Sequence, residues 1–277
     1  MAAANTICFN EITRRSEELM KRLLVALFSL LLVGIIAVAQ EVEKKPEAKP
    51  QDTKAAEPLP AADQIIDKYV AALGGKVAIE KQTSRVTKGT FDIPAFGASG
   101  TWEGFAKAPN KSISIIDVPG FGVVRQAFDG TVAWEDNPQV GMNEKSGAAL
   151  TRVKLDSDFY RDIKLKELYP KMTVKGKQKV GEKDAYVIEA TPTGASAETW
   201  YFDAETGLLL RADSERETPN GVAMVQLYLE DYGEVDGVKM PHTLRQTTPD
   251  FTISIKMSEI KHNIDIEDAK FAKPPAK

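Results

Sequence analysis

The sequence predicts a mainly β fold with helices (α+β), in which a curved antiparallel sheet forms an incompletely closed barrel with helices covering the opening. From residue 84 onward, apolar and polar residues alternate in short segments. Turn signals such as Asp129-Gly130 and Asp236-Gly237 separate these segments. Turns this short join antiparallel neighbours, whereas parallel strands need long crossovers. A sheet of about eleven such strands tends to curl.

The N-terminus has the pattern of a secretory signal peptide. In MKRLLVALFSLLLVGIIAVAQ, residues 20–40, the basic pair Lys21 and Arg22 precedes an apolar run and the small-x-small sequence Ala37-Val38-Ala39. The apolar run, residues 23–38, is shorter than the roughly 20 residues of a membrane span. We therefore expect residues 1–39 to be an upstream segment plus signal peptide, with the true start at Met20 and cleavage after Ala39. An N-terminal anchor that is not cleaved is the alternative.

Residues 40–61 predict a disordered tether, since they contain four prolines and almost no apolar side chains. Residues 62–277 are then expected to form a single domain that begins with a helix. Asp63 is a suitable N-cap, and Gly74-Gly75 ends the helix. An apolar stripe at helical spacing between them would cover one end of the sheet: Ile65, Ile66, Tyr69, Val70 and Leu73. A shorter helix is expected over residues 76–81.

The strands are expected in two groups, separated by one or two short helices over residues 147–169 that Pro170 ends. The first group covers residues 85–93, 100–108, 112–118, 121–128 and 131–135. The second covers residues 172–180, 185–191, 199–202, 208–212, 222–232, 238–246 and 251–261. Within the second group, Asp203 to Gly207 predicts a hairpin loop in which Gly207 takes a positive φ.

The residues that most enzymes and metal sites use are scarce. His242 and His262 lie in different segments without the spacing of a metal pair, and the single cysteine, Cys8, completes no disulfide or metal motif. Neither a nucleophile elbow nor a phosphate-binding glycine loop is present. A net charge of −4 excludes an overall basic field for nucleic acid. We expect no enzyme activity, metal, cofactor or nucleic-acid partner, while an acidic pair of the glycosidase kind stays open.

Several motifs resemble those of one family: ALGG, KGTF, GTWEGFAKAPNK, FDGTVAW, KVGEKDAYVIEATP, TWYFDAETGLLLR and EDYGEVDGVKMPHTLR. Over residues 62–275 the chain resembles the LolA-like superfamily, the broad group of outer-membrane lipoprotein-sorting proteins. The resemblance implies a location in the periplasm and an unclosed antiparallel barrel of about eleven strands wrapped round helices. It also implies a cavity for acyl chains of lipoproteins or other lipids. We expect a monomer.

Such a cavity needs a large apolar wall and a movable lid, because each buried methylene contributes about 0.8 kcal/mol. The candidate wall residues are apolar side chains of the predicted strands, and ordinary core packing is the alternative for each: Trp102, Ile113, Ile115, Val124, Trp134, Val187, Phe202, Leu227, Phe251, Ile253 and Ile255. Arg125, a charge within the apolar segment GFGVVRQAF, resembles a lumen arginine that helps to close the lid in the family's soluble carrier. An exposed strand charge is the alternative for Arg125.

Three functions fit these features. The first is a non-enzymatic periplasmic carrier or binding protein for lipoprotein acyl chains or other lipids. The second is a periplasmic sensor or interaction module that binds a protein partner, such as an envelope membrane protein, without transporting lipid. The third is an exported hydrolase with an acidic pair. If the protein is a carrier, we expect an apolar cavity. If it is a hydrolase, we expect two close acids in a polar cleft.

Overall fold

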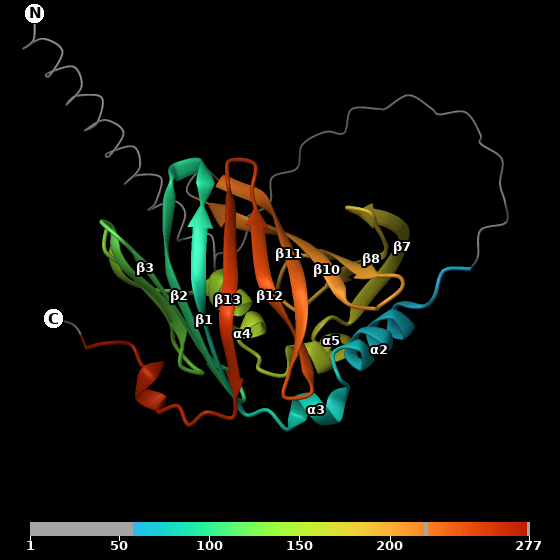
Figure 1. Ribbon diagram of the computed structural model, residues 1–277, viewed down its shortest axis with the longest axis horizontal. Helices are drawn as coiled ribbons and strands as arrows, with labels where there is room; N and C mark the ends of the chain where they lie inside the picture. Colours follow the sequence, from blue (N-terminus) through green and yellow to red (C-terminus); the bar gives the residue numbers. More distant parts are fainter. Residues whose placement is uncertain (1–57, 219–220, 276–277) are drawn as a thin grey trace, which may run out of the picture.

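The computed structural model describes residues 58–218 and 221–275. Within these residues, thirteen strands form one antiparallel sheet in the order β6-β5-β4-β3-β2-β1-β13-β12-β11-β10-β9-β8-β7. The sheet curls without closing, so that β6 and β7 are its two edges (Figure 1). The predicted signal peptide, the start at Met20, Cys8 and residues 40–57 of the predicted tether lie outside the described residues.

The strands form two meanders, in which neighbours in the sequence are also neighbours in the sheet. The first meander consists of β1 (Ser84–Ile93), β2 (Ala98–Lys107), β3 (Lys111–Val118), β4 (Gly122–Phe128), β5 (Ala133–Asn137) and β6 (Gly141–Glu144). The second consists of β7 (Lys171–Val180), β8 (Lys183–Thr191), β9 (Glu198–Asp203), β10 (Leu209–Thr218), β11 (Gly221–Val235), β12 (Val238–Thr247) and β13 (Thr252–His262). The pairing of β1 with β13 joins the two meanders into one sheet.

Helices lie before the sheet and in the connection between its two edges. The helices α2 (Ala62–Ala72) and α3 (Lys76–Glu80) precede β1. The connection from β6 to β7 contains α4 (Gly147–Asp156), the 3-10 turn η3 (Arg161–Ile163) and α5 (Leu165–Leu168), and the sheet curls round this connection (Figure 1). Two further 3-10 turns are η2 (Pro94–Phe96) and η4 (Asp268–Lys270). None of the helices in residues 58–218 and 221–275 has the length and apolar character needed to cross a membrane.

The predicted fold is confirmed: the sheet is antiparallel, curled and unclosed, and helices accompany it. The sheet has thirteen strands, slightly more than the expected count of about eleven. β6 was not among the predicted segments, because its four residues are exposed and show no apolar alternation. The predicted strand over residues 131–135 begins too early. The carboxylate of Asp129 accepts hydrogen bonds from the backbone N–H groups of Thr131 and Val132, both at 2.8 Å, which holds these residues in a turn before β5.

The first helix also differs from the prediction at its start. Ala61, and not Asp63, is the N-cap of α2, and the side chain of Gln64 accepts a hydrogen bond from the Ala61 N–H at 2.9 Å. The predicted apolar stripe is confirmed, since Ile65, Ile66 and Tyr69 are the buried residues of α2. Gly207 takes the predicted positive φ, 79°.

Strand alternation divides the apolar side chains between two faces of the sheet. We call the face toward α4 and α5 the inner face and the opposite one the outer face. The inner face of β1, β3, β4 and β11 to β13 carries one buried apolar cluster, and α2 and α5 cover the inner face of β8 and β9 with a second. On the outer face of the first meander, Ile266 and Phe271 of the C-terminal segment pack with Val86, Ile113 and Trp134.

Candidate functional site

Two rows of paired residues run across the inner face of the second meander. From β9 to β13, the first row consists of Trp200, Ala212, Leu227, Gln246 and Ile253. From β9 to β11, the second row consists of Glu198, Ser214 and Val225. Members of the two rows are two residues apart along each strand, so both rows face the same side of the sheet.

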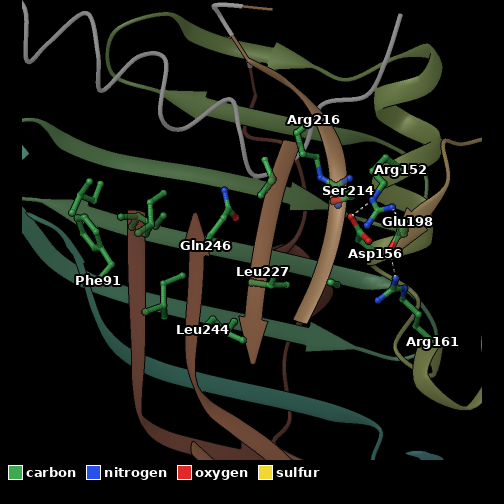
Figure 2. A pocket seen from close by; sticks show the side chains of 16 residues that line it. Phe91, Arg152, Asp156, Arg161, Glu198, Ser214, Arg216, Leu227, Leu244 and Gln246 are labelled. Carbon is green, nitrogen blue, oxygen red and sulfur yellow. Dashed lines mark hydrogen bonds and ion pairs between the residues drawn. The ribbon is translucent and has the colours of Figure 1, made fainter. Parts of the chain in front are cut away.

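A cavity of about 220 Å³, which we call the central pocket, lies against these rows. Most of its wall is apolar and comes from β1, β3 and β10 to β13: Phe91, Ile93, Ile116, Ala212, Val225, Leu227, Leu244, Ile253 and Ile255. The remaining lining residues are polar: Arg152, Asp156, Arg161, Glu198, Ser214, Arg216 and Gln246. Figure 2 shows Phe91 at one end of the pocket and Arg152, Glu198 and Arg161 at the other. The pocket therefore has an apolar end and a polar end.

Glu198 is the centre of the polar end, where its side chain is buried. Its carboxylate accepts hydrogen bonds from the Tyr169 hydroxyl at 2.8 Å, from Trp200 Nε1 at 2.9 Å and from Arg152 Nη1. Arg161 Nη2 lies 3.4 Å from the second carboxylate oxygen. These four groups come from α4, η3, the end of α5 and β9, so Glu198 holds the helical connection against the sheet.

The charges around Glu198 fix its ionisation state. Burial alone would raise the pKa of its carboxyl, but the positive charges of Arg152 and Arg161 and the hydrogen bonds from Trp200 and Arg152 outweigh burial and lower the pKa to about 2. Burial disfavours the charged form of both arginines. The carboxylates of Asp156 and Glu198 outweigh burial at Arg152, and the Tyr169 hydroxyl together with Glu198 outweighs it at Arg161, so the pKa of each lies above its ordinary value. Glu198 is therefore an anion at neutral pH.

Arg152 joins two acids, because its Nε also donates to Asp156 at 2.7 Å. Arg216 differs from Arg152 and Arg161, since among the described side chains it has no carboxylate partner, and its Nη1 donates to the backbone carbonyl of Glu215 at 3.1 Å. Burial and the nearby charge of Arg152 lower the pKa of Arg216 to about 10, which still leaves it protonated at neutral pH. With three arginines and two carboxylates, the polar end carries an excess positive charge.

Two buried nitrogen atoms in the pocket wall have no hydrogen-bond partner among the described residues. They are Nε2 of Gln246 and Nε of Arg161. In Figure 2 the side chain of Gln246 lies between Phe91 and Ser214, on the apolar part of the wall. An unpaired buried donor costs about 1–3 kcal/mol, so both atoms are positions where a ligand oxygen would stabilise the protein.

Three of the predicted wall residues line the central pocket: Leu227, Ile253 and Ile255. Val124 and Phe251 belong to the apolar cluster next to it and do not line it. Trp102 packs against the same cluster, and its Nε1 donates to Ser114 Oγ at 3.0 Å. Phe202 is also on the inner face, but α2 covers it: its side chain is fully buried, and its ring centre lies 5.2 Å from that of Tyr69.

The other five candidates lie away from the central pocket. Ile113, Ile115 and Trp134 face the outer side and pack in the cluster of the C-terminal segment. Val187 packs with Tyr201 and Leu210 in a separate cluster. Arg125 shares the outer face with Ile115, its pairing partner, and lies 3.5 Å from Asp136, so it does not reach the pocket as a lid-closing residue would. The reason is strand alternation, which separates these side chains from Val124 and Leu227.

The polar end was not foreseen from the sequence, although a signal for part of it exists. In ETWYF, Glu198 occupies the same alternating position as the buried Trp200 and Phe202, and a charge in an apolar series of this kind marks a functional or paired site. Arg216 similarly continues the series of Ala212 and Ser214. Arg152 and Arg161 give no such signal, because their position depends on how the helical connection folds.

Among the described residues, no group of three or more His, Cys, Asp or Glu side chains is arranged to hold a metal ion. An apolar wall with a charged end matches an amphiphile, whose apolar chain and polar group need opposite surroundings.

Comparison with known proteins supports the fold. No protein-family model and no curated protein sequence matches the chain. A DUF1329 family protein from Desulfovibrio piger aligns with a TM-score of 0.55 and 16% identity, over 76% of this chain and 96% of that chain. A LolA superfamily protein from Nitrosomonas europaea aligns with a TM-score of 0.50 and 15% identity, over 78% of this chain and 99% of that chain. The similarity to the LolA fold that the motifs predicted is confirmed.

Proposed function

We propose that this protein, which has the fold of LolA superfamily proteins, is a non-enzymatic periplasmic carrier or binding protein for lipid or lipoprotein acyl chains. The observation that carries the proposal is the central pocket, a cavity of about 220 Å³ whose wall is mostly apolar and which α4 and η3 leave open. If the helices filled the space inside the curled sheet completely, the apolar side chains of the wall would only pack in the core, and no ligand could enter.

The size and chemistry of the pocket support an acyl chain as the ligand. Its volume lies below the roughly 300–1,000 Å³ of pockets that enclose a whole drug-sized molecule, which favours one chain over a cluster of chains. Each methylene that enters such a wall contributes about 0.8 kcal/mol, so a single chain supplies several kcal/mol without any catalytic group.

The acids of the pocket argue against a hydrolase. Asp156 and Glu198 are the acids among its lining residues, and Arg152 is bonded to both. A general acid must hold a proton near the working pH, whereas the pKa of Glu198 is lowered to about 2. Glu198 therefore does not hold the proton that a general acid must supply.

The location rests on the sequence. The basic pair, the apolar run and the small residues of positions 20–39 support export, and residues 40–61 would allow the domain to stand away from its exit point. In this proposal the protein works in the periplasm as a monomer, and an envelope membrane protein is the partner that would supply or receive the acyl chain.

The test is ligand capture by the exported protein purified without detergent. Native mass spectrometry should show a bound species of lipid mass, and a fluorescent fatty acid should bind. The variant Leu227→Trp fills the pocket and should abolish both signals. Ile115→Trp is the matched control, because Ile115 is also a partly buried aliphatic strand residue but faces the outer side.

A protein that carries no lipid and takes up no fatty acid would overturn the proposal and favour the sensor or interaction module. The same holds if Leu227→Trp and Ile115→Trp bind the fatty acid equally well while both melt as cooperatively as the parent protein. Binding lost in both variants through misfolding would show in the melting curves, and Leu227→Phe then replaces the larger substitution.

A further inference from the structure

The polar end of the central pocket carries a positive charge that no described side chain neutralises. Arg152 pairs with Glu198 and Asp156, and Arg161 pairs with Glu198, whereas Arg216 has a backbone carbonyl as its acceptor among the described residues. A half-buried cation without an anion is unfavourable, and an incoming anion relieves that cost. Burial, together with the neighbouring charge of Arg152, lowers the pKa of Arg216 to about 10.

Arg216 also stands at a border of the pocket. Arg152, Ser214 and Arg216 line both the central pocket and a small adjoining hollow, which Ala148 of α4, the loop residues 195–197 and Glu215 complete. A group held there can meet solvent while a chain attached to it extends along the apolar wall toward Phe91. Figure 2 shows this arrangement, with Arg216 and Phe91 well separated and Leu227 and Leu244 between them.

We propose that Arg216 binds the anionic head group of a single-chain amphiphile, a carboxylate or a phosphate, whose acyl chain occupies the apolar part of the central pocket. This inference rests on the proposed function and adds the charge and orientation of the ligand to it. Arg152 and Arg161 contribute a positive field but keep their own partners, so Arg216 is the residue that distinguishes anionic from neutral ligands. Its guanidinium can donate two parallel hydrogen bonds to either kind of head group.

The test compares ligands that share one saturated chain and differ in the head group. A fatty acid, a lysophosphatidic acid and the neutral fatty alcohol compete with a fluorescent fatty acid for the full chain at low ionic strength. We expect the two anionic ligands to bind about tenfold more tightly than the alcohol, the effect of one charge-assisted contact. Added salt should reduce this advantage, because it screens a partly exposed charge.

Two variants of Arg216 and one control locate the effect. Arg216→Gln should remove the preference for anionic ligands and leave the affinity for the alcohol within about twofold, whereas Arg216→Lys should keep part of the preference. Arg125→Gln removes an arginine from the outer face and should change neither affinity.

Each outcome separates the inference from the proposed function. If the alcohol binds as tightly as the anionic ligands, or if Arg216→Gln keeps the preference, the head-group assignment is overturned and the acyl-chain function stands. If inorganic phosphate alone competes as well as lysophosphatidic acid, the site takes free anions, and the assignment to an amphiphile is overturned. If none of the chain-bearing ligands binds, both proposals fall.

Discussion

Arg152 on α4 and Glu198 on β9 are 46 residues apart in the sequence and form a buried ion pair between the helical connection and the sheet. Since α4 belongs to the segment that runs from one sheet edge to the other, the pair fixes this segment against the inner face. The polar end of the central pocket therefore has a fixed base, beside which Arg216 is the half-buried charge that has no carboxylate partner among the described side chains.

Loss of the charge on Glu198 should destabilise the fold strongly. Glu198→Gln keeps the size of the side chain but leaves the buried Arg152 and the half-buried Arg161 without their shared anion. We expect a loss of about 3 kcal/mol or more in the free energy of unfolding, measured by urea denaturation. Glu189→Gln is the control, because Glu189 pairs with Lys175 where both side chains are nearly half exposed, and it should cost less than about 1 kcal/mol. Equal losses in the two variants would contradict a special role for the buried pair.

The carboxylate of Glu198 should make the free energy of unfolding depend on pH in the acidic range. The pKa of Glu198 is about 2 in the folded protein and about 4.5 in the unfolded chain, so its contribution is complete above pH 4.5 and is lost as the pH falls toward 2. The difference in unfolding free energy between the parent protein and Glu198→Gln should therefore shrink across this range. Taking the difference removes the effects of the other carboxyl groups. A difference that stays constant down to pH 2 would show that the pKa is not lowered.

Removal of the unpaired amide of Gln246 in the pocket wall should stabilise the protein when no ligand is bound. Gln246→Leu replaces a buried amide, whose Nε2 has no partner among the described residues, by an apolar group of similar length. We expect a gain of about 1 kcal/mol in the free energy of unfolding without ligand. The control is Gln139→Leu at an exposed turn, which should be nearly neutral. A loss of stability in Gln246→Leu would mean that the amide is satisfied in the folded protein.

The C-terminal segment should contribute to stability without affecting the pocket. Phe271 is fully buried on the outer face, where its backbone carbonyl accepts a hydrogen bond from Trp134 Nε1 at 2.9 Å. Phe271→Ala should cost about 3–5 kcal/mol and leave acyl-chain affinity unchanged in the protein that stays folded. Lys273→Ala removes a contact with the exposed Glu144 and should have little effect on either quantity. Weaker ligand binding in folded Phe271→Ala would show that the two faces are coupled.

The strand segments along the sequence and the hairpins between them could be predicted because their signals are local. Alternation and turn residues identified all strands except β6, and they also fixed Gly207 in its left-handed conformation. The start of α2 was misplaced by a local competition, since Gln64 caps the chain at Ala61 in place of Asp63.

The site could be predicted only in part, because alternation does not reveal which face points inward. Leu227, Ile253 and Ile255 were assigned to the wall together with Ile113 and Trp134, which obey the same rule on the opposite face. The face was decided by partners far away in the sequence: the helical connection on one side and the C-terminal segment on the other. The arginines of α4 and η3 depend entirely on that placement.

The pairing of β1 with β13 also determines when the sheet can be completed during synthesis. The contact between Ser258 Oγ and the carbonyl of Lys88 joins residues 170 apart, so this seam cannot form until the last strand has been synthesised. Until then β1 is an open edge, with Phe91 and Ile93 exposed beside it. We expect the nascent chain to depend on chaperones throughout this interval, and its final strand to be the step that ends its risk of aggregation.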